Sequence, residues 1–271
     1  MKVFFRDSGY QSFYEKNGYV KIQILNDDDI NFLLETCRSL PPPFINLGFH
    51  TSLLNQRKES RLKAHEAVKS VLWKRTEPIF NDFRPMLGSF LVKQGGELGI
   101  CQIHQDWTFV DESDGSRSFH VWCPLVKTDS ENGNLCVLPG SHLLPTMPRV
   151  APSSYFPYQS ERCIEFIQKH SIAVPTQAGE AIIYDNALIH HSPPNKTNLP
   201  RIAAGLLTIP KSERLVHLNG TNSSFEYEKY FVEEDFYLNY SEVNHPGNGS
   251  EAEKMVFENN RDSLETLEKY C

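Results

Sequence analysis

The spacing of hydrophobic residues along this 271-residue chain changes in character near residue 85. Before it, apolar residues recur three and four positions apart, as in Ile30, Leu33, Leu34 and Cys37, which is the period of a helix. This spacing predicts one helix from about residue 27 to the prolines at 41–43, and a second over 58–82. A strand is predicted at 19–24, where Val-Lys-Ile-Gln-Ile alternates after an Asn-Gly turn.

From residue 87 to residue 210 the apolar residues instead form short runs bounded by glycine, proline, asparagine and aspartate. Such runs are typical of strands separated by turns. A helix at 160–169 is the one interruption that the pattern predicts. The expected strands are 88–93, 98–110, 118–126, 135–138, 172–174, 181–184, 188–191 and 202–209.

The last 60 residues return to a helical or irregular pattern. Seven aromatic residues lie between Phe225 and Tyr240. They are expected either to pack on the outside of the β-structure or to form a lid over its mouth. A surface helix is predicted from Glu251 to Lys269.

Many short strands with turn residues between them predict an all-β sandwich or barrel rather than alternating β–α units. The fold expected is therefore mainly β with flanking helices. We expect a single domain over residues 1–271. Its core is about 85–210, its N-terminal helical support is 1–84, and an aromatic and acidic extension occupies 211–271.

Composition excludes several classes of protein. No apolar run approaches the roughly 18 residues of a membrane helix. Residues 221–271 hold 12 acidic and 4 basic residues, and the rest of the chain is close to neutral, so no basic stripe suggests a nucleic-acid partner. The six cysteines form no Cys-x-x-Cys pair, which is typical of free thiols in a reducing compartment. A cytoplasmic protein is expected, and its oligomeric state stays open.

The candidate chemistry lies at His104 and Asp106. In a strand, residues two apart share a face, so an imidazole and a carboxylate would project side by side. A distant histidine on a returning strand could complete the set, and both His190 and His191 qualify. Two imidazoles and one carboxylate with open positions on the metal are the ligands of non-haem Fe(II) oxygenases. The alternative is a strand histidine beside a surface aspartate.

Longer motifs resemble the phytanoyl-CoA dioxygenase family of Fe(II)- and 2-oxoglutarate-dependent oxygenases, over about residues 10–210. The motifs are His104-Gln-Asp106, the Glu-Asn-Gly-Asn-Leu to Leu-Pro-Gly-Ser-His segment at 131–142, and the segment 188–201 from Leu188 to Arg201. The resemblance implies a double-stranded β-helix, or jelly roll. Two departures are His191, where the family often has glycine, and Gly179-Glu180, where it usually has Gly-Asp.

The same resemblance implies roles for individual residues. Because the family's arginine follows its histidine ligand by eleven positions, His190 rather than His191 matches the third metal ligand. Arg201 and Ser192 match the residues that bind the distal carboxylate of 2-oxoglutarate, Trp122 matches an aromatic residue beside it, and Lys93 matches a lysine that some members use. Trp107, Phe109 and His191 are candidates for contact with the substrate.

The implied reaction consumes Fe(II)-activated O2 and 2-oxoglutarate and hydroxylates a small-molecule substrate. Asp106 favours hydroxylation, or the related desaturation or epoxidation, over halogenation, since related halogenases replace this carboxylate with a small residue. The segments 44–57, 141–165 and 225–240 are expected to cover the pocket. They are polar and aromatic, which favours a small polar metabolite, such as an amino acid or an alkaloid-type natural product.

Three alternatives remain. One is a fatty acyl-CoA hydroxylase of the same family, although no basic patch for the phosphates is apparent. The others are a cupin-like metal enzyme without oxygenase activity and a binding module that has kept the barrel.

Overall fold

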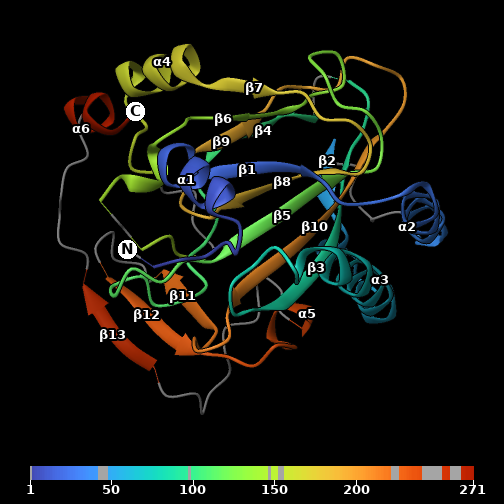
Figure 1. The fold of residues 1–271 in the computed structure, drawn as a ribbon, viewed down its shortest axis with the longest axis horizontal. Coiled ribbons are helices and arrows are strands. Elements are labelled where there is room, and N and C mark those ends of the chain that lie inside the picture. The colour runs from blue at the N-terminus through green and yellow to red at the C-terminus, as the bar shows by residue number, and fades with distance from the viewer. Residues whose placement is uncertain are drawn as a thin grey trace.

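The computed structural model describes residues 2–41, 48–96, 99–145, 148–151, 156–220, 226–239, 252–256 and 264–271. Two antiparallel sheets face each other across a shared core, and helices cover the outer face of the larger sheet (Figure 1). A third small sheet lies at one end of the molecule. The double-stranded β-helix with flanking helices is thereby confirmed.

The larger sheet has six strands in the order β1-β8-β5-β10-β3-β2, and every neighbouring pair is antiparallel. The long central strands agree with the predicted runs, although β3 begins five residues earlier than expected. The strands are β1 (Tyr19–Gln23), β2 (Phe49–Thr51), β3 (Phe83–Lys93), β5 (Phe119–Pro124), β8 (Glu180–Asp185) and β10 (Arg201–Pro210).

The smaller sheet has four strands in the order β4-β9-β6-β7. They are β4 (Cys101–His104), β6 (Leu135–Val137), β7 (Ile172–Val174) and β9 (His190–Ser192). Between the two sheets lies a core that includes Trp122 and Ile182 from the larger sheet and Leu135 and Val137 from the smaller. Side chains from both sheets therefore meet in this interior.

Strand alternation gives the larger sheet two buried faces, because successive side chains point to opposite sides. Ala181 and Ile183 face the helices, whereas Ile182 and Tyr184 face the smaller sheet. Being buried on both sides explains why these strands are nearly continuous apolar runs.

Helices α1 (Ser8–Asn17), α2 (Asp27–Ser39) and α3 (Lys58–Thr76) lie along the N-terminal part of the chain. Residues of all three belong to the core cluster beneath the larger sheet. Helix α2 begins where the aspartates predicted it, since Asn26 accepts a hydrogen bond from the Asp29 backbone in a capping box. Helix α3 ends at Thr76, shortly before Pro78. Helix α1 was not predicted.

The prediction of a helical or irregular C-terminal part is wrong for three strands, although helix α6 (Leu264–Tyr270) agrees with the end of the helix predicted up to Lys269. Strands β11 (Val216–Gly220), β12 (Glu226–Phe231) and β13 (Ala252–Val256) form an antiparallel sheet. The predicted helix from Glu251 is also wrong in its first part, which is strand β13. Residues 257–263 of that prediction lie outside the described part of the chain.

Two further helices are α5 (Phe236–Asn239) and α6 (Leu264–Tyr270), and α4 (Glu161–His170) matches the predicted 160–169. Helices α4 and α6 pack beside the smaller sheet through a cluster that includes Leu138, Ile167 and Leu267. In the described part of the chain, no helix combines the length and apolarity needed to cross a membrane.

Candidate metal and co-substrate site

His104, Asp106 and His190 converge at the open end of the space between the two sheets. His104 ends strand β4 and pairs with His190, which opens β9, so the two rings lie 4.2 Å apart between centres. Asp106 Oδ1 lies 3.6 Å from His104 Nε2 and 3.9 Å from His190 Nε2. One potential ligand atom from each residue lies within 4.8 Å of the other two.

The predicted strand over 98–110 is too long, because β4 ends at His104 and Asp106 lies in the following loop. The loop's backbone is bonded to other segments instead. Arg149 Nε donates to the Asp106 carbonyl at 2.6 Å, and the Thr108 amide donates to the Arg149 carbonyl at 3.0 Å. Asp106 therefore reaches His104 through this anchored loop and not through strand alternation.

Backbone carbonyls fix the orientation of both imidazoles. His104 Nδ1 lies 2.7 Å from the Gln102 carbonyl, and His190 Nδ1 lies 2.9 Å from the Leu188 carbonyl. A carbonyl can only accept, so each Nδ1 carries the hydrogen and each Nε2 keeps its lone pair in the neutral ring. A partner on the second ring nitrogen is the usual way in which a metal-binding histidine is oriented.

The three residues fit a divalent metal ion. Ligand bonds of about 2.1 Å at right angles would place neighbouring ligand atoms about 3 Å apart, so the carboxylate–imidazole separations of 3.6 and 3.9 Å need only a small contraction. Burial lowers the pKa of His190 to about 3, which keeps its imidazole neutral for coordination. Burial opposes ionisation of Asp106, but its electrostatic interactions with the neighbouring His104 and His190 outweigh burial and lower its pKa.

Lys93 and Arg201 form a second feature, a pair of buried cations inside the barrel. They lie directly opposite each other on β3 and β10, and their exposed fractions are 0% and 2%. Burial, and after it the charge of Arg201, lower the pKa of Lys93 from 10.5 to about 7. Burial lowers the pKa of Arg201 to about 10. Within the described part of the chain, neither cation has a carboxylate partner. Like charges directly opposite each other on paired strands are destabilising, so an anion bound between them would relieve the repulsion.

Neutral oxygen atoms hold these cations in place. Lys93 Nζ donates to Ser192 Oγ at 2.7 Å, and Arg201 donates to the Gly133 carbonyl at 2.6 Å and to Ser192 Oγ at 3.2 Å. Gly133 has a φ of +80°, and an added Cβ would lie 2.4 Å from the Pro193 carbonyl and 3.1 Å from Lys93 Nζ. Only glycine allows the backbone to approach the two cations this closely.

Aromatic rings line the space between the cations and the metal ligands. The Arg201 guanidinium lies 5.2 Å from the centre of the Trp122 ring. The Tyr184 hydroxyl lies 3.4 Å from His190 Nε2, and the Tyr184 ring stacks on His120 at 5.4 Å. His120 Nδ1 in turn lies 3.8 Å from Asp106 Oδ2.

Sequence reasoning missed Tyr184 and His120 as site residues. The alternation of the 118–126 strand carried the signal, because it places His120 on the same face as Trp122. Gly205 on the neighbouring strand makes room for the His120 ring, since a Cβ there would lie 2.5 Å from His120 Nε2.

A cavity of about 590 Å³ opens beside the metal ligands, and His104, Trp107 and His191 are among its lining residues. His191 follows His190 in the strand and faces this cavity. Phe109 does not line it and instead packs against Tyr237, with ring centres 5.4 Å apart. Its ring also lies 6.5 Å from that of Trp107, so it contacts the pocket wall from behind.

The three segments expected to cover the pocket have different positions. The described residues of 141–165 supply much of one wall of this cavity. Those of 44–57 line a separate cavity of about 330 Å³, and those of 225–240 form β12 and α5 against strand β11 and Phe109. Residues 44–47, 146–147, 152–155, 225 and 240 lie outside the described part.

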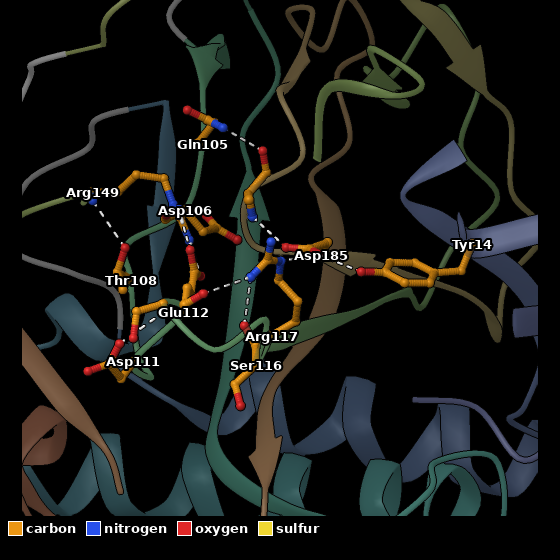
Figure 2. Close-up of polar contacts among 12 residues, drawn as sticks. Tyr14, Gln105, Asp106, Thr108, Asp111, Glu112, Ser116, Arg117, Arg149 and Asp185 are labelled. Atoms are coloured by element: carbon orange, nitrogen blue, oxygen red, sulfur yellow. Dashed lines mark hydrogen bonds and ion pairs between the residues drawn. The ribbon is translucent and has the colours of Figure 1, made fainter. Parts of the chain in front are cut away.

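A buried network of charges supports the Asp106 loop (Figure 2). Arg149 forms a two-point ion pair with Glu112, at 2.6 and 3.0 Å. Arg117 donates to the Glu112 carbonyl at 3.5 Å and lies 3.5 Å from Asp185. Asp185 is fully buried and accepts a 2.7 Å hydrogen bond from Tyr14; burial and the charge of Glu112 raise its pKa to about 6.

Comparison with known proteins gives one family and several related structures. The sequence profile of the phytanoyl-CoA dioxygenase family matches residues 14–203. The epimerase SnoN, in complex with Fe3+, alpha ketoglutarate and nogalamycin RO, superposes with a TM-score of 0.56 at 17% identity, covering 92% of this chain and 94% of SnoN.

EctD from S. alaskensis, with 2-oxoglutarate and 5-hydroxyectoine, has a TM-score of 0.53 at 21% identity, covering 77% of this chain and 78% of EctD. HygX from Streptomyces hygroscopicus, with nickel, 2-oxoglutarate and hygromycin B bound, has a TM-score of 0.53 at 12% identity, covering 76% and 88%. At these identities the likeness shows a shared fold.

Proposed function

The chain belongs to the phytanoyl-CoA dioxygenase family, and from that premise we propose that it hydroxylates an unactivated C–H bond of a small polar metabolite. It is a 2-oxoglutarate-dependent dioxygenase that uses iron. The observation that carries the proposal is the buried Lys93–Arg201 pair, which binds Ser192, two residues from His190, and lacks an acidic partner in the described part of the chain. We place the enzyme in a reducing compartment such as the cytoplasm, supported by its six free cysteines.

His104, Asp106 and His190 hold the iron in this proposal. Iron bound there supplies the activation of O2, which places one oxygen atom in the hydroxylated product and the other in succinate as 2-oxoglutarate loses CO2. Two imidazoles and one carboxylate leave further positions on the metal for the co-substrate and O2. The ionised Asp106 and neutral His190 are already in the protonation states that coordination requires.

Arg201, Lys93 and Ser192 bind the distal carboxylate of 2-oxoglutarate. A guanidinium can bind a carboxylate at two points, and the buried ammonium adds a second cation. Trp122 packs on the Arg201 guanidinium and limits the co-substrate to one orientation. Bound 2-oxoglutarate also offsets the repulsion between the two cations. Binding of the co-substrate should therefore stabilise the folded protein.

Trp107 and His191 line the substrate pocket, and Phe109 supports Trp107 from behind. The cavity of about 590 Å³ is in the range of about 300–1,000 Å³ that suits small molecules. The acyl-CoA alternative is disfavoured, because the phosphates of CoA would need cations and the described lining has only Arg149, which is paired with Glu112. A cupin-like metal enzyme or a binding module gives no reason for the Lys93–Arg201 pair.

The test is to add Fe(II) and 2-oxoglutarate to metal-free protein without O2 and to record the visible spectrum. A weak charge-transfer band that requires both additions is the expected result. The band should be lost in His190→Ala and in Arg201→Ala, and kept in His191→Ala as the matched control. If no band forms and the metal binds regardless of 2-oxoglutarate, the proposal fails.

A further inference from the structure

The walls of the substrate cavity combine apolar and amide side chains. Trp107 and Phe156 are the aromatic residues of the described lining, and glutamines at 102, 105, 159 and 168 bring amide groups to it. An amide both donates and accepts hydrogen bonds, so it can bind hydroxyl, carbonyl or amide groups of a ligand. It cannot neutralise a charge.

Arg149 is the only lysine, arginine, aspartate or glutamate among the described lining residues. Its guanidinium donates to both Glu112 oxygens, and its Nε donates to the Asp106 carbonyl. The side chains of Arg149 and Glu112 are only 8% and 6% exposed. Burial lowers the pKa of Arg149, but the charge of Glu112 outweighs this and raises it, so the cation persists and is neutralised inside the protein.

The sequence of the pocket wall agrees with this neutrality. Residues 141–160 contain no aspartate, glutamate or lysine, and Arg149 is their only arginine. Helix α4 turns Ile164 and Gln168 toward the cavity, while its charged residues lie outside the described lining. Apart from Arg149, neither residues 141–160 nor helix α4 therefore places a lysine, arginine, aspartate or glutamate in the described lining of the cavity.

We propose that this pocket takes an uncharged molecule with an apolar body and hydroxyl, carbonyl or amide groups, and that Glu112 keeps the pocket neutral by pairing with Arg149. A charged ligand would lose hydration here without gaining a partner, which disfavours its binding. The inference rests on the proposed function and narrows its small polar metabolites to uncharged ones. Free amino acids and protonated alkaloids are then poor substrates.

The experiment uses the full-length protein loaded with Fe(II) and 2-oxoglutarate, without O2. Its charge-transfer band is recorded first, because absence of the band refutes the proposed function rather than this inference. Three matched sets of fragments are then tested at millimolar concentration: uncharged compounds, their carboxylate analogues and their amine analogues. Binding is measured as a perturbation of the band.

The expected result is that the uncharged set binds at least about tenfold more tightly than its charged analogues, the effect of one unpaired charge at a buried contact. Gln168→Lys should shift the preference toward carboxylates, and Gln168→Glu toward amines. Gln168 is exposed on α4, so both variants should fold. Lys169→Gln, an exposed change outside the described lining, is the control and should leave the preference unchanged.

Glu112→Gln tests the role of the ion pair. It should raise the affinity for carboxylates relative to uncharged analogues by about tenfold, because Arg149 loses its partner. If this variant does not fold, the comparison of Gln168→Lys with Gln168→Glu tests the inference. Preferential binding of either charged set by the wild-type protein, or no binding of the uncharged set, would overturn the inference.

Discussion

The proposed role of Lys93 in binding the distal carboxylate predicts that the affinity for 2-oxoglutarate depends on pH. Burial and the adjacent Arg201 lower the pKa of Lys93 from 10.5 to about 7. The carboxylate of the co-substrate needs the protonated ammonium. Affinity should therefore be highest below pH 7 and should fall by up to about tenfold per pH unit above it, until the pKa of the bound complex is reached.

The stability of the ligand-free protein should change in the opposite direction. The shift from 10.5 to about 7 corresponds to about 5 kcal/mol by which the fold disfavours the charged form. Because the folded-state pKa is lower than the unfolded one, the unfolded chain binds more protons between pH 7 and 10.5. The contribution of Lys93 to stability is therefore lowest below pH 7 and rises across that window.

The assay is an anaerobic titration of the Fe(II)-loaded protein with 2-oxoglutarate at several pH values between about 6.5 and 8.5, with Lys93→Met as the comparison. The variant should bind more weakly at the lowest pH and should lack the pH dependence assigned to Lys93, so that the two affinity curves approach each other at high pH. In denaturation of the ligand-free proteins, Lys93→Met should be the more stable, most of all below pH 7. An equal pH dependence in both proteins would refute the reasoning.

Three further predictions concern the site and its support. His190→Gly should abolish stoichiometric iron binding while His191→Gly keeps it, as measured by metal content after gel filtration; the reverse order would exchange their roles. Gly205→Ala should destabilise the fold by about 1–3 kcal/mol through a clash with His120, and an unchanged denaturation midpoint would show that the ring can move aside. Leu267→Ala, in the fully buried contact of α6, should cost about 2–4 kcal/mol of unfolding free energy; a change below 0.5 kcal/mol would show that this helix is not docked in solution.

The central strands and the metal ligands could be predicted because their signals are local. Alternating or continuous apolar runs follow from burial of one or both faces of a strand, and the long strands of the larger sheet were found in this way. The resemblance to the family placed His190 as the third ligand, and the grouping of His104, Asp106 and His190 within 4.8 Å agrees with it.

The C-terminal sheet could not be read from the sequence. Charged and aromatic residues are mixed along β12, and its alternation carries little contrast between an apolar face and a polar one. This strand is stabilised by pairing with β11 and β13. Contacts of this kind depend on tertiary context more than on local propensity.

The sequence by itself determined the ligand types and the β-rich core, because residue chemistry and strand period are properties of short segments, and the family resemblance selected His190 over His191. Only the tertiary structure decided that Asp106 approaches His104 and His190 from a loop held by Arg149, that Lys93 and Arg201 face each other without a described acidic partner, and that Glu112 pairs with the Arg149 of the cavity wall. Each of these depends on groups 37 to 108 positions apart in the chain coming close together, and no local pattern records such a distance.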